Sequence, residues 1–157
     1  MIKVAVLASG GGTNLQAIID VIENRELTGI TISMVLSDNE DSYALERAKK
    51  NNIPTEVIKK SEYTVREDYD KVLVERLNKY EIELVVLAGF MRLLSPVMTK
   101  AFPLRIINIH PSLLPSFPGL DVQRKAIEYG AKFSGATVHF VDNGVDTGPI
   151  ILQGTVP

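Results

Sequence analysis

Residues 2–14 read IKVAVLASGGGTN, an apolar run that ends in three consecutive glycines. The run from Ile2 to Leu7 is rich in β-branched residues and predicts a buried strand, and the glycines predict a tight turn after it. Beyond the turn, four apolar residues have the spacing of one helix face: Leu15, Ile18, Ile19 and Ile22. A strand, a glycine turn and an amphipathic helix in this order are typical of a layered α/β fold.

The rest of the chain continues this alternation. Six further apolar segments predict strands: Ile30–Leu36, Thr55–Ile58, Ile82–Ala88, Leu104–Ile109, Ser134–Val141 and Pro149–Gln153. The segments between the first four of these, and residues 121–129, predict helices, one of them opened by Ser95 as N-cap with Pro96 behind it. We therefore expect an α/β fold, an open, mostly parallel, twisted sheet of about seven strands with helices on both faces. The last two strands are joined by a short turn, so this pair can be antiparallel.

Composition excludes several classes of protein. With 157 residues the chain has the size of a single domain. The net charge of −2 argues against a nucleic-acid or membrane partner, and the absence of cysteine excludes disulfides, a thiolate nucleophile and Cys-ligated metals. With only two histidines, we expect no metal site. The apolar stretch from Val4 to Ala8 is too short for a signal peptide, so we expect a soluble, cytoplasmic protein.

The glycine loop is the first candidate binding site. It opens a helix whose free N–H groups and positive dipole suit a phosphate group. A dinucleotide fingerprint is incomplete, because Leu15 stands where its third glycine belongs, and a Walker lysine is absent. We expect a mononucleotide or sugar phosphate here; the alternative is a tight turn without a ligand.

The second candidate site follows the strand Leu104–Ile109. Asn108 and His110 are two residues apart, so in a strand both side chains point to the same side. An amide donor and an imidazole together could stabilise and protonate an oxyanion. Asp146 could face His110 and favour its charged form. Taken singly, Asn108 and His110 also fit an ordinary turn, and Asp146 fits a turn-stabilising role.

Four segments, in this order, carry a family resemblance: SGGGTNLQAI (residues 9–18), AGFMRLLSP (88–96), NIHPSLLP (108–115) and DTGPII (146–151). They resemble the phosphate loop, folate-pocket segment, catalytic loop and last active-site turn of the glycinamide ribonucleotide formyltransferases. These are folate-dependent enzymes of purine synthesis. The resemblance covers nearly the whole chain and implies a Rossmann-like formyltransferase fold.

The resemblance also implies a role for individual residues. Asn108, His110 and Asp146 would form the catalytic trio, with His110 as general acid, Asn108 stabilising the oxyanion and Asp146 raising the pKa of His110. The phosphate of the ribonucleotide would be held by Gly12, Thr13 and Asn14. The co-substrate 10-formyltetrahydrofolate would be held by Arg66, Met91, Arg92, Leu93, Leu94, Asn108, Asp142 and Asp146.

Each binding role has a simpler alternative. On the sequence alone, Arg66 is a solvated charge near a helix start, and Met91, Leu93 and Leu94 are core residues. His139 lies in an alternating run, and we expect it to be structural or to support the site. We expect small-molecule substrates as partners, and neither nucleic acid nor a membrane. The expected assembly is a monomer or a homodimer.

The chain departs from the family at its end. Relatives continue past the last strand into a closing helical segment, which has no match here. We therefore expect one formyltransferase domain, residues 1–157, that is truncated at its C-terminus relative to the family and leaves some apolar surface exposed.

Three functions stay open at this point. The first is formyl transfer to glycinamide ribonucleotide. The second is another formyl-folate enzyme, but the formyltetrahydrofolate hydrolase has an additional N-terminal domain, for which there is no room before Ile2. The formylase of initiator methionyl-tRNA lacks the triple-glycine Asn loop and needs an RNA-binding domain and a basic surface. The third is a ligand-binding fragment without catalysis.

Overall fold

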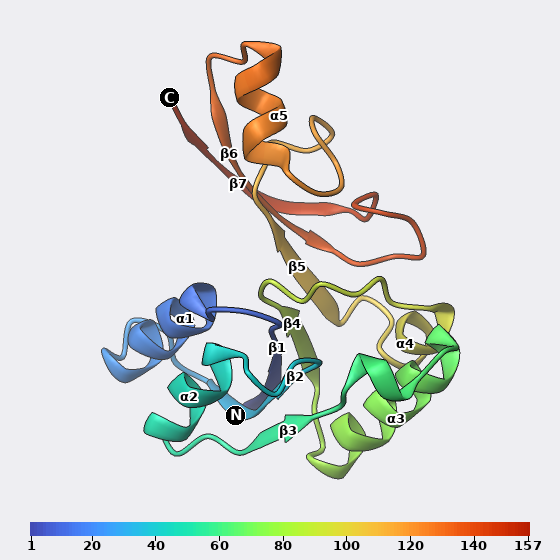
Figure 1. Ribbon diagram of the computed structural model, residues 1–157. Coiled ribbons are helices and arrows are strands. Elements are labelled where there is room, and N and C mark those ends of the chain that lie inside the picture. Colours follow the sequence, from blue (N-terminus) through green and yellow to red (C-terminus); the bar gives the residue numbers. More distant parts are fainter. The chain divides into compact units, whose positions relative to one another are not determined.

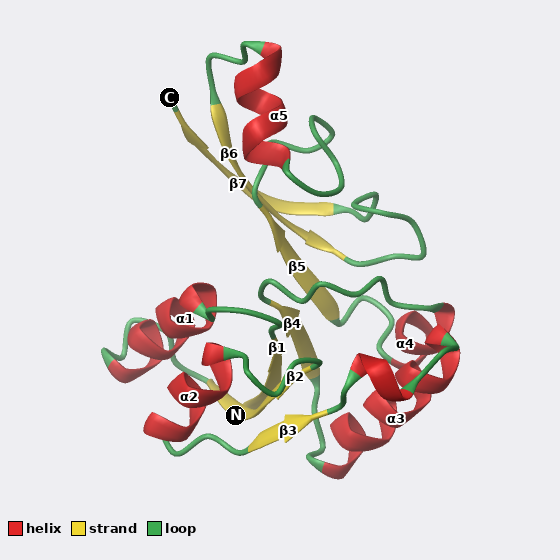
Figure 2. Ribbon diagram, viewed as in Figure 1, coloured by secondary structure: helices red, strands yellow, loops and turns green.

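The computed structural model describes all 157 residues. Its elements are β1 (Ile2–Leu7), α1 (Thr13–Glu23), β2 (Ile30–Ser37), α2 (Tyr43–Lys50), β3 (Thr55–Val57), the 3₁₀ turn η1 (Lys60–Glu62), α3 (Arg66–Lys79), β4 (Leu84–Leu87), α4 (Pro96–Ala101), β5 (Ile106–His110), α5 (Val122–Tyr129), β6 (Ser134–Phe140) and β7 (Ile150–Val156). Every predicted strand and helix is present, with ends shifted by a few residues, as is usual for element boundaries (Figures 1 and 2).

The seven strands form one sheet in the order β3-β2-β1-β4-β5-β6-β7. β1 pairs in parallel with β2 and with β4, and β2 pairs in parallel with β3. β6 runs antiparallel to both of its neighbours, β5 and β7. The predicted mostly parallel α/β sheet is confirmed, and so is the antiparallel last pair. The antiparallel β5–β6 pair is an addition that the sequence pattern did not indicate.

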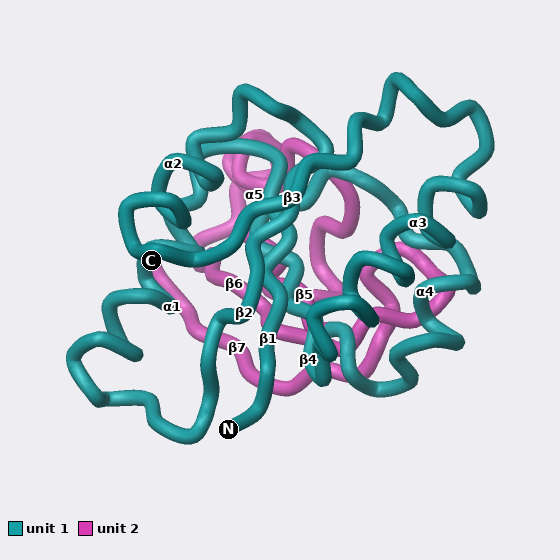
Figure 3. The backbone as a smooth tube through the Cα atoms, turned by 90° about the horizontal axis from the view of Figure 1, so that it is seen from below, with its two compact units in different colours: residues 1–106 teal, residues 107–157 magenta.

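The chain divides into two compact units, residues 1–106 and residues 107–157 (Figure 3). The single-domain organisation expected from the sequence stays a prediction.

In the first unit, helices cover both faces of the sheet: α1 and α2 lie on one side of β1 and β2, and α3 and α4 lie on the other (Figure 1). The core on the α1–α2 side consists of small and branched apolar residues: Val4, Val6, Ala8, Leu15, Ile19, Ile32, Val35, Ala44, Leu45, Ala48 and Ala88. β1 is buried on both faces from Val4 onward, as expected for a central parallel strand. Full burial of one leucine side chain contributes about 1.5–3 kcal/mol to such a core.

In the second unit, β5, β6 and β7 form an antiparallel ribbon with α5 alongside (Figure 2). Every residue of β7 is exposed, including four apolar ones: Ile150, Ile151, Leu152 and Val156. This agrees with the exposed apolar surface expected around the last strand. None of the helices has the length and apolar character needed to cross a membrane.

Candidate active site

The glycine loop leaves β1 and enters α1 through a backbone conformation that requires glycine. Gly12 is the N-cap of α1 and has φ +72°. A Cβ atom there would lie 2.7 Å from both Cα and Cβ of Ala44, so a side chain would collide with α2. The first N–H groups of α1 at Thr13 and Asn14 have no partner within the helix, which suits an anion.

The predicted folate segment begins beside this loop, because it follows β4, the neighbour of β1. The Ser9 N–H donates to the carbonyl of Gly89 (3.0 Å), and the Met91 N–H donates to Ser9 Oγ (2.9 Å). Met91 and Leu93 are 65% and 57% exposed, whereas Leu94 is 9% exposed. Two large apolar side chains thus stand in solvent beside the glycine loop instead of in the core, which supports a ligand-facing role for Met91 and Leu93.

Arg92 of this segment packs on a buried tyrosine. Its guanidinium carbon lies 3.8 Å from the ring centroid of Tyr69, a cation–π contact. The Tyr69 hydroxyl donates to the carbonyl of Ile58 (2.9 Å), and burial raises the pKa of Tyr69. The Nε atom of Arg92 is buried without a hydrogen-bond partner. Arg92 is therefore held by its planar face.

Asp70 is a buried carboxylate influenced by the charges of both arginines predicted to bind folate. It is fully buried, and its Oδ2 accepts a hydrogen bond from the Ser95 N–H (2.5 Å). Burial raises the pKa of Asp70, while Ser95 and the charges of Arg92 and Arg66 act in the opposite direction. Arg66 is exposed at the first position of α3. Both guanidinium groups thus lie in the electrostatic neighbourhood of one carboxylate, where their positive charge could also bind an anionic ligand.

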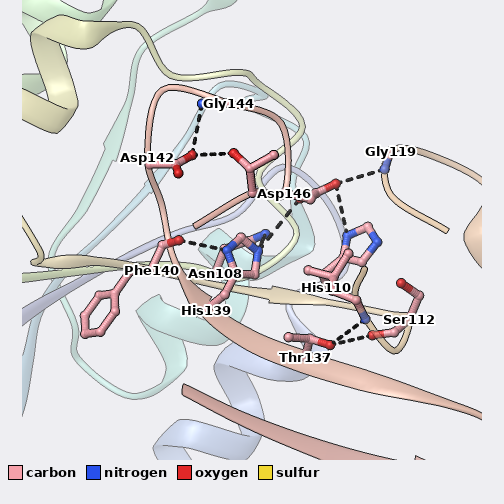
Figure 4. A network of polar contacts seen from close by, with 12 residues as sticks. Asn108, His110, Ser112, Gly119, Thr137, His139, Phe140, Asp142, Gly144 and Asp146 are labelled. Atoms are coloured by element: carbon pink, nitrogen blue, oxygen red, sulfur yellow. Dashed lines mark hydrogen bonds and ion pairs between the residues drawn. The ribbon is translucent and has the colours of Figure 1, made fainter. Parts of the chain in front are cut away.

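In the second unit, three elements bring four polar side chains into one network (Figure 4). Asn108 and His110 come from β5, His139 comes from β6, and Asp146 comes from the turn between β6 and β7. The β5–β6 register places Asn108 directly opposite His139. The predicted trio of Asn108, His110 and Asp146 therefore lies close together, and His139 contacts both Asn108 and Asp146.

His110 is held through both ring nitrogens. Its Nδ1 lies 3.5 Å from Asp146 Oδ2, and its Nε2 lies 2.9 Å from the carbonyl oxygen of Phe117. The side chain is 6% exposed and that of Asp146 is 13% exposed. Asp146 Oδ2 also accepts the Gly119 N–H (2.8 Å). With a carboxylate on one side and a carbonyl on the other, the surroundings of this imidazole accept hydrogen bonds at both nitrogens.

His139 contacts the other two members of the trio. Its Nδ1 lies 2.9 Å from the carbonyl oxygen of Phe140, its Nε2 lies 3.2 Å from Asn108 Nδ2, and Nε2 lies 3.8 Å from Asp146 Oδ1. A carbonyl only accepts, so the neutral tautomer compatible with this network has its proton on Nδ1 and accepts from Asn108 through Nε2. This contact fixes the orientation of the Asn108 amide and leaves its second N–H free to donate elsewhere.

The turn after β6 is organised by Asp142. Its Oδ1 accepts from the Thr147 hydroxyl (2.7 Å) and the Gly144 N–H (2.9 Å), and these hydrogen bonds lower the pKa of Asp142. Asp146, in the same turn, has φ +54°, a left-handed conformation that aspartate tolerates better than most residues. Asp142 thus stabilises the turn that carries Asp146. This role does not depend on a contact with a ligand.

Sequence reasoning missed several groups in this network. The Phe117 carbonyl and the Gly119 N–H are backbone atoms of a proline-rich loop, for which no side-chain signal exists. His139 was expected only to be structural or to support the site, and the structure gives it contacts to both Asn108 and Asp146. No group of three or more His, Cys, Asp and Glu side chains is arranged to hold a metal ion.

Comparison with known proteins gives a consistent result. The sequence model of the formyl transferase family matches residues 2–157. The chain is 45% identical over 155 residues to the phosphoribosylglycinamide formyltransferase of Escherichia coli K12, covering 99% of this chain and 73% of that protein. It is 49% identical over 156 residues to the trifunctional purine biosynthetic protein adenosine-3 of Drosophila pseudoobscura pseudoobscura, covering 99% of this chain and 11% of that protein.

Solved structures show the same likeness. The glycinamide ribonucleotide transformylase 1 of Symbiobacterium toebii superposes with a TM-score of 0.97 at 51% identity, covering 100% of this chain and 74% of that one. The phosphoribosylglycinamide formyltransferase of Bacillus halodurans superposes with a TM-score of 0.94 at 42% identity, covering 98% of this chain and 79% of that one.

Proposed function

Since the chain belongs to the formyl transferase family, we propose that it transfers a formyl group from 10-formyltetrahydrofolate to the amine of glycinamide ribonucleotide, with Asn108, His110 and Asp146 around the reacting atoms. The protein is a folate-dependent formyltransferase, and 10-formyltetrahydrofolate is its co-substrate. The observation that carries the residue assignment is the contact of His110 Nδ1 with Asp146 Oδ2 at 3.5 Å, beside an amide held in one orientation.

The first step is attack of the substrate amine on the formyl carbon, which places negative charge on the formyl oxygen. The free N–H of Asn108 stabilises this charge, because this donor is already held in position, and the positive charge of a protonated His110 adds to the effect. Water would have to reorganise to do the same. Asn108 is thus assigned to the oxyanion, and His139 positions it.

The second step is collapse of the tetrahedral intermediate. The bond between the formyl carbon and N10 of the folate breaks, and N10 leaves as an amine only if it receives a proton. His110 donates this proton through Nε2, the nitrogen that faces away from Asp146, after exchanging its contact with the Phe117 carbonyl for the substrate or a bridging water. The proton lost by the attacking amine restores the imidazolium, so the step balances. Asp146, 3.5 Å from Nδ1, holds the ring in its orientation throughout.

Each ligand has its own set of proposed binding residues. Gly12, Thr13 and Asn14 hold the ribonucleotide phosphate at the start of α1. Arg66 meets the acidic tail of the folate, and Met91, Arg92, Leu93 and Leu94 line the pocket for its pterin ring. The exposure of Met91 and Leu93 supports this contact. Asn108, Asp142 and Asp146 are assigned polar contacts to the folate.

The protein's setting is part of the same proposal. A net charge of −2 with no cysteine fits a cytoplasmic enzyme acting on small molecules, with neither nucleic acid nor membrane as partner, as a monomer or homodimer. The chain spans 73% of the length of the Escherichia coli relative.

The test is a formyl-transfer assay on the purified chain with both substrates, following tetrahydrofolate release and formylated ribonucleotide. We expect both products in equal amounts, and both to form at least about a hundredfold more slowly with the His110→Ala protein. Tetrahydrofolate released without ribonucleotide would instead identify a formyltetrahydrofolate hydrolase. Ligand binding without any product would identify a binding domain.

A further inference from the structure

The carbonyl groups of the glycine loop are held by the neighbouring helix α2. The Gly10 carbonyl accepts the Ser42 hydroxyl (2.7 Å) and the Ala44 N–H (3.1 Å). The Gly11 carbonyl accepts Arg47 Nε (2.7 Å). Two consecutive carbonyl groups of the loop are therefore turned toward α2 by donors from that helix.

This arrangement determines where the loop's N–H groups point. In a planar trans peptide, the carbonyl of one residue and the N–H of the next point in opposite directions. Fixing the Gly10 and Gly11 carbonyls toward α2 turns the N–H groups of Gly11 and Gly12 away from it. The Gly12 carbonyl accepts the Gln16 N–H (2.9 Å) within α1, so the Thr13 N–H points out of the helix start. The N–H groups of Gly11, Gly12 and Thr13 are therefore turned away from α2 and from the body of α1. Successive N–H groups left available in this way form an anion-binding nest.

Ser42 shows that this use of α2 is specific. It is the N-cap residue of α2, where a serine ordinarily accepts a hydrogen bond from the first helical turn, yet it makes no such bond. Its buried hydroxyl donates to Gly10 instead. The hydroxyl at the N-terminus of α2 thus binds the glycine loop instead of capping its own helix.

Arg47 is held in place for the same contact. It is half-buried, its guanidinium carbon lies 4.8 Å from the ring centroid of Tyr43, and its Nη1 lies 3.4 Å from Gln16 Oε1. Nε, the atom on the Gly11 carbonyl, is one of five donors on a group that is always charged. Arg47 could act on a bound phosphate either through this hydrogen bond or through its charge alone, and the two can be separated experimentally.

We propose that Arg47 and Ser42 are positioning residues for the phosphate of the ribonucleotide: they hold the loop's carbonyls so that its N–H groups are pre-aligned for the anion. This rests on the proposed function, since it takes the glycine loop as the phosphate site. Neither side chain is assigned a contact with the reacting atoms.

The test compares Arg47→Gln with Arg47→Met, two replacements whose side chains are equal to each other in length. A glutamine amide nitrogen lies as many bonds from Cα as Arg Nε, so Arg47→Gln keeps a neutral donor there. Arg47→Met puts a methyl group at that position and keeps none. Arg47→Met should raise the KM for ribonucleotide about three- to tenfold, with the KM for folate and kcat at saturation unchanged. Arg47→Gln should stay within about twofold of wild type, and Ser42→Ala should resemble Arg47→Met.

Lys49→Met, a charge removed from an exposed position of the same helix, is the matched control, and thermal unfolding checks that each variant is folded. Equal losses in Arg47→Gln and Arg47→Met would overturn the proposal in favour of charge alone, and wild-type KM values in Arg47→Met and Ser42→Ala would overturn it altogether. Calorimetric Kd values for ribonucleotide in the absence of folate distinguish failure of this inference from failure of the proposed function. A chain that binds ribonucleotide without formyl transfer disproves the activity only, whereas a chain that does not bind it overturns the inference.

Discussion

Asn108 Nδ2 and His139 Nε2 lie 3.2 Å apart, across the antiparallel pair of β5 and β6. The amide has two N–H groups, and this contact uses one of them, so the direction of the other is determined by His139. The contact of His139 Nδ1 with the Phe140 carbonyl holds the imidazole in turn. In the proposed mechanism this N–H is the oxyanion donor, and it is fixed before substrate arrives, which is the condition for efficient electrostatic stabilisation.

Replacing His139 should therefore act through Asn108. Removal of a single oxyanion donor typically lowers kcat about 10²–10³-fold, and we expect His139→Ala to reach up to about a hundredfold. Kinetics of the single variants His139→Ala and Asn108→Ala, and of the double variant, form a thermodynamic cycle. The double variant should be little worse than Asn108→Ala alone. Independent, additive losses would show that His139 does not act through the amide.

Asp146→Asn should lower kcat by about two to four powers of ten, as should His110→Ala, because one variant removes the carboxylate that holds the general acid and the other removes the acid itself. The Kd for ribonucleotide should change little in either. In this proposal Asp146 acts through His110, so the double variant His110→Ala/Asp146→Asn should be little slower than His110→Ala alone. Additive losses would disprove the coupling between the two residues.

Gly12→Val should abolish tight ribonucleotide binding while leaving folate binding nearly intact. The new Cβ would meet Ala44 atoms at 2.7 Å in a backbone conformation that valine disfavours. Gly29→Val is the matched control, because Gly29 also has positive φ (+81°) but no atom within 4 Å of its Cβ position. It should cost about 1–2 kcal/mol in stability and leave the Kd for ribonucleotide unchanged. Equal loss of both ligands in Gly12→Val would indicate a folding defect.

Arg66→Ala should raise the Kd for folate several-fold without changing that for ribonucleotide. An exposed ion pair is worth up to about 1 kcal/mol, or about fivefold in Kd. Arg76→Ala, at the other end of α3 beside Glu56, removes the same charge and serves as control. A folate analogue without its glutamate tail should bind wild type and Arg66→Ala equally. If Arg66→Ala still weakens binding of that analogue, Arg66 acts on another part of the molecule.

Asp70→Asn tests a pH effect on stability. Burial raises the native pKa of Asp70 above its ordinary value of 3.8. The native state then holds this proton more tightly than the unfolded state, so the contribution is fully present below about pH 4 and is lost as pH rises through the native pKa. Asparagine keeps an acceptor for the Ser95 N–H and does not titrate.

The wild type should therefore lose stability relative to Asp70→Asn as pH increases from about 4, in urea unfolding measured at several pH values. Asp68→Asn, on the exposed side of the same helix, is the control and should show no such divergence. Parallel stability curves for wild type and Asp70→Asn would contradict a raised native pKa.

Local sequence features were sufficient for most elements of the fold. The strand at Ile2–Leu7, the glycine turn and the first helix were all predicted from periodicity and glycine placement, because these depend on residues near each other in the chain. Ser95 with Pro96 correctly marked the start of α4, where Ser95 Oγ accepts the Val97 N–H. Strand direction beyond the parallel core was not accessible in this way, since neighbours in a sheet need not be neighbours in sequence.

The sequence by itself determined which residue types could do the chemistry, and the motif order was specific enough to indicate their family. Tertiary structure alone decided how they meet. His139 lies 31 positions from Asn108, and only the antiparallel β5–β6 register places them opposite each other. The donors of Ser42 and Arg47 reach the glycine loop only because α2 packs beside it, close enough to exclude any side chain at residue 12. Such contacts depend on packing between distant segments, and no local pattern of polar residues encodes them.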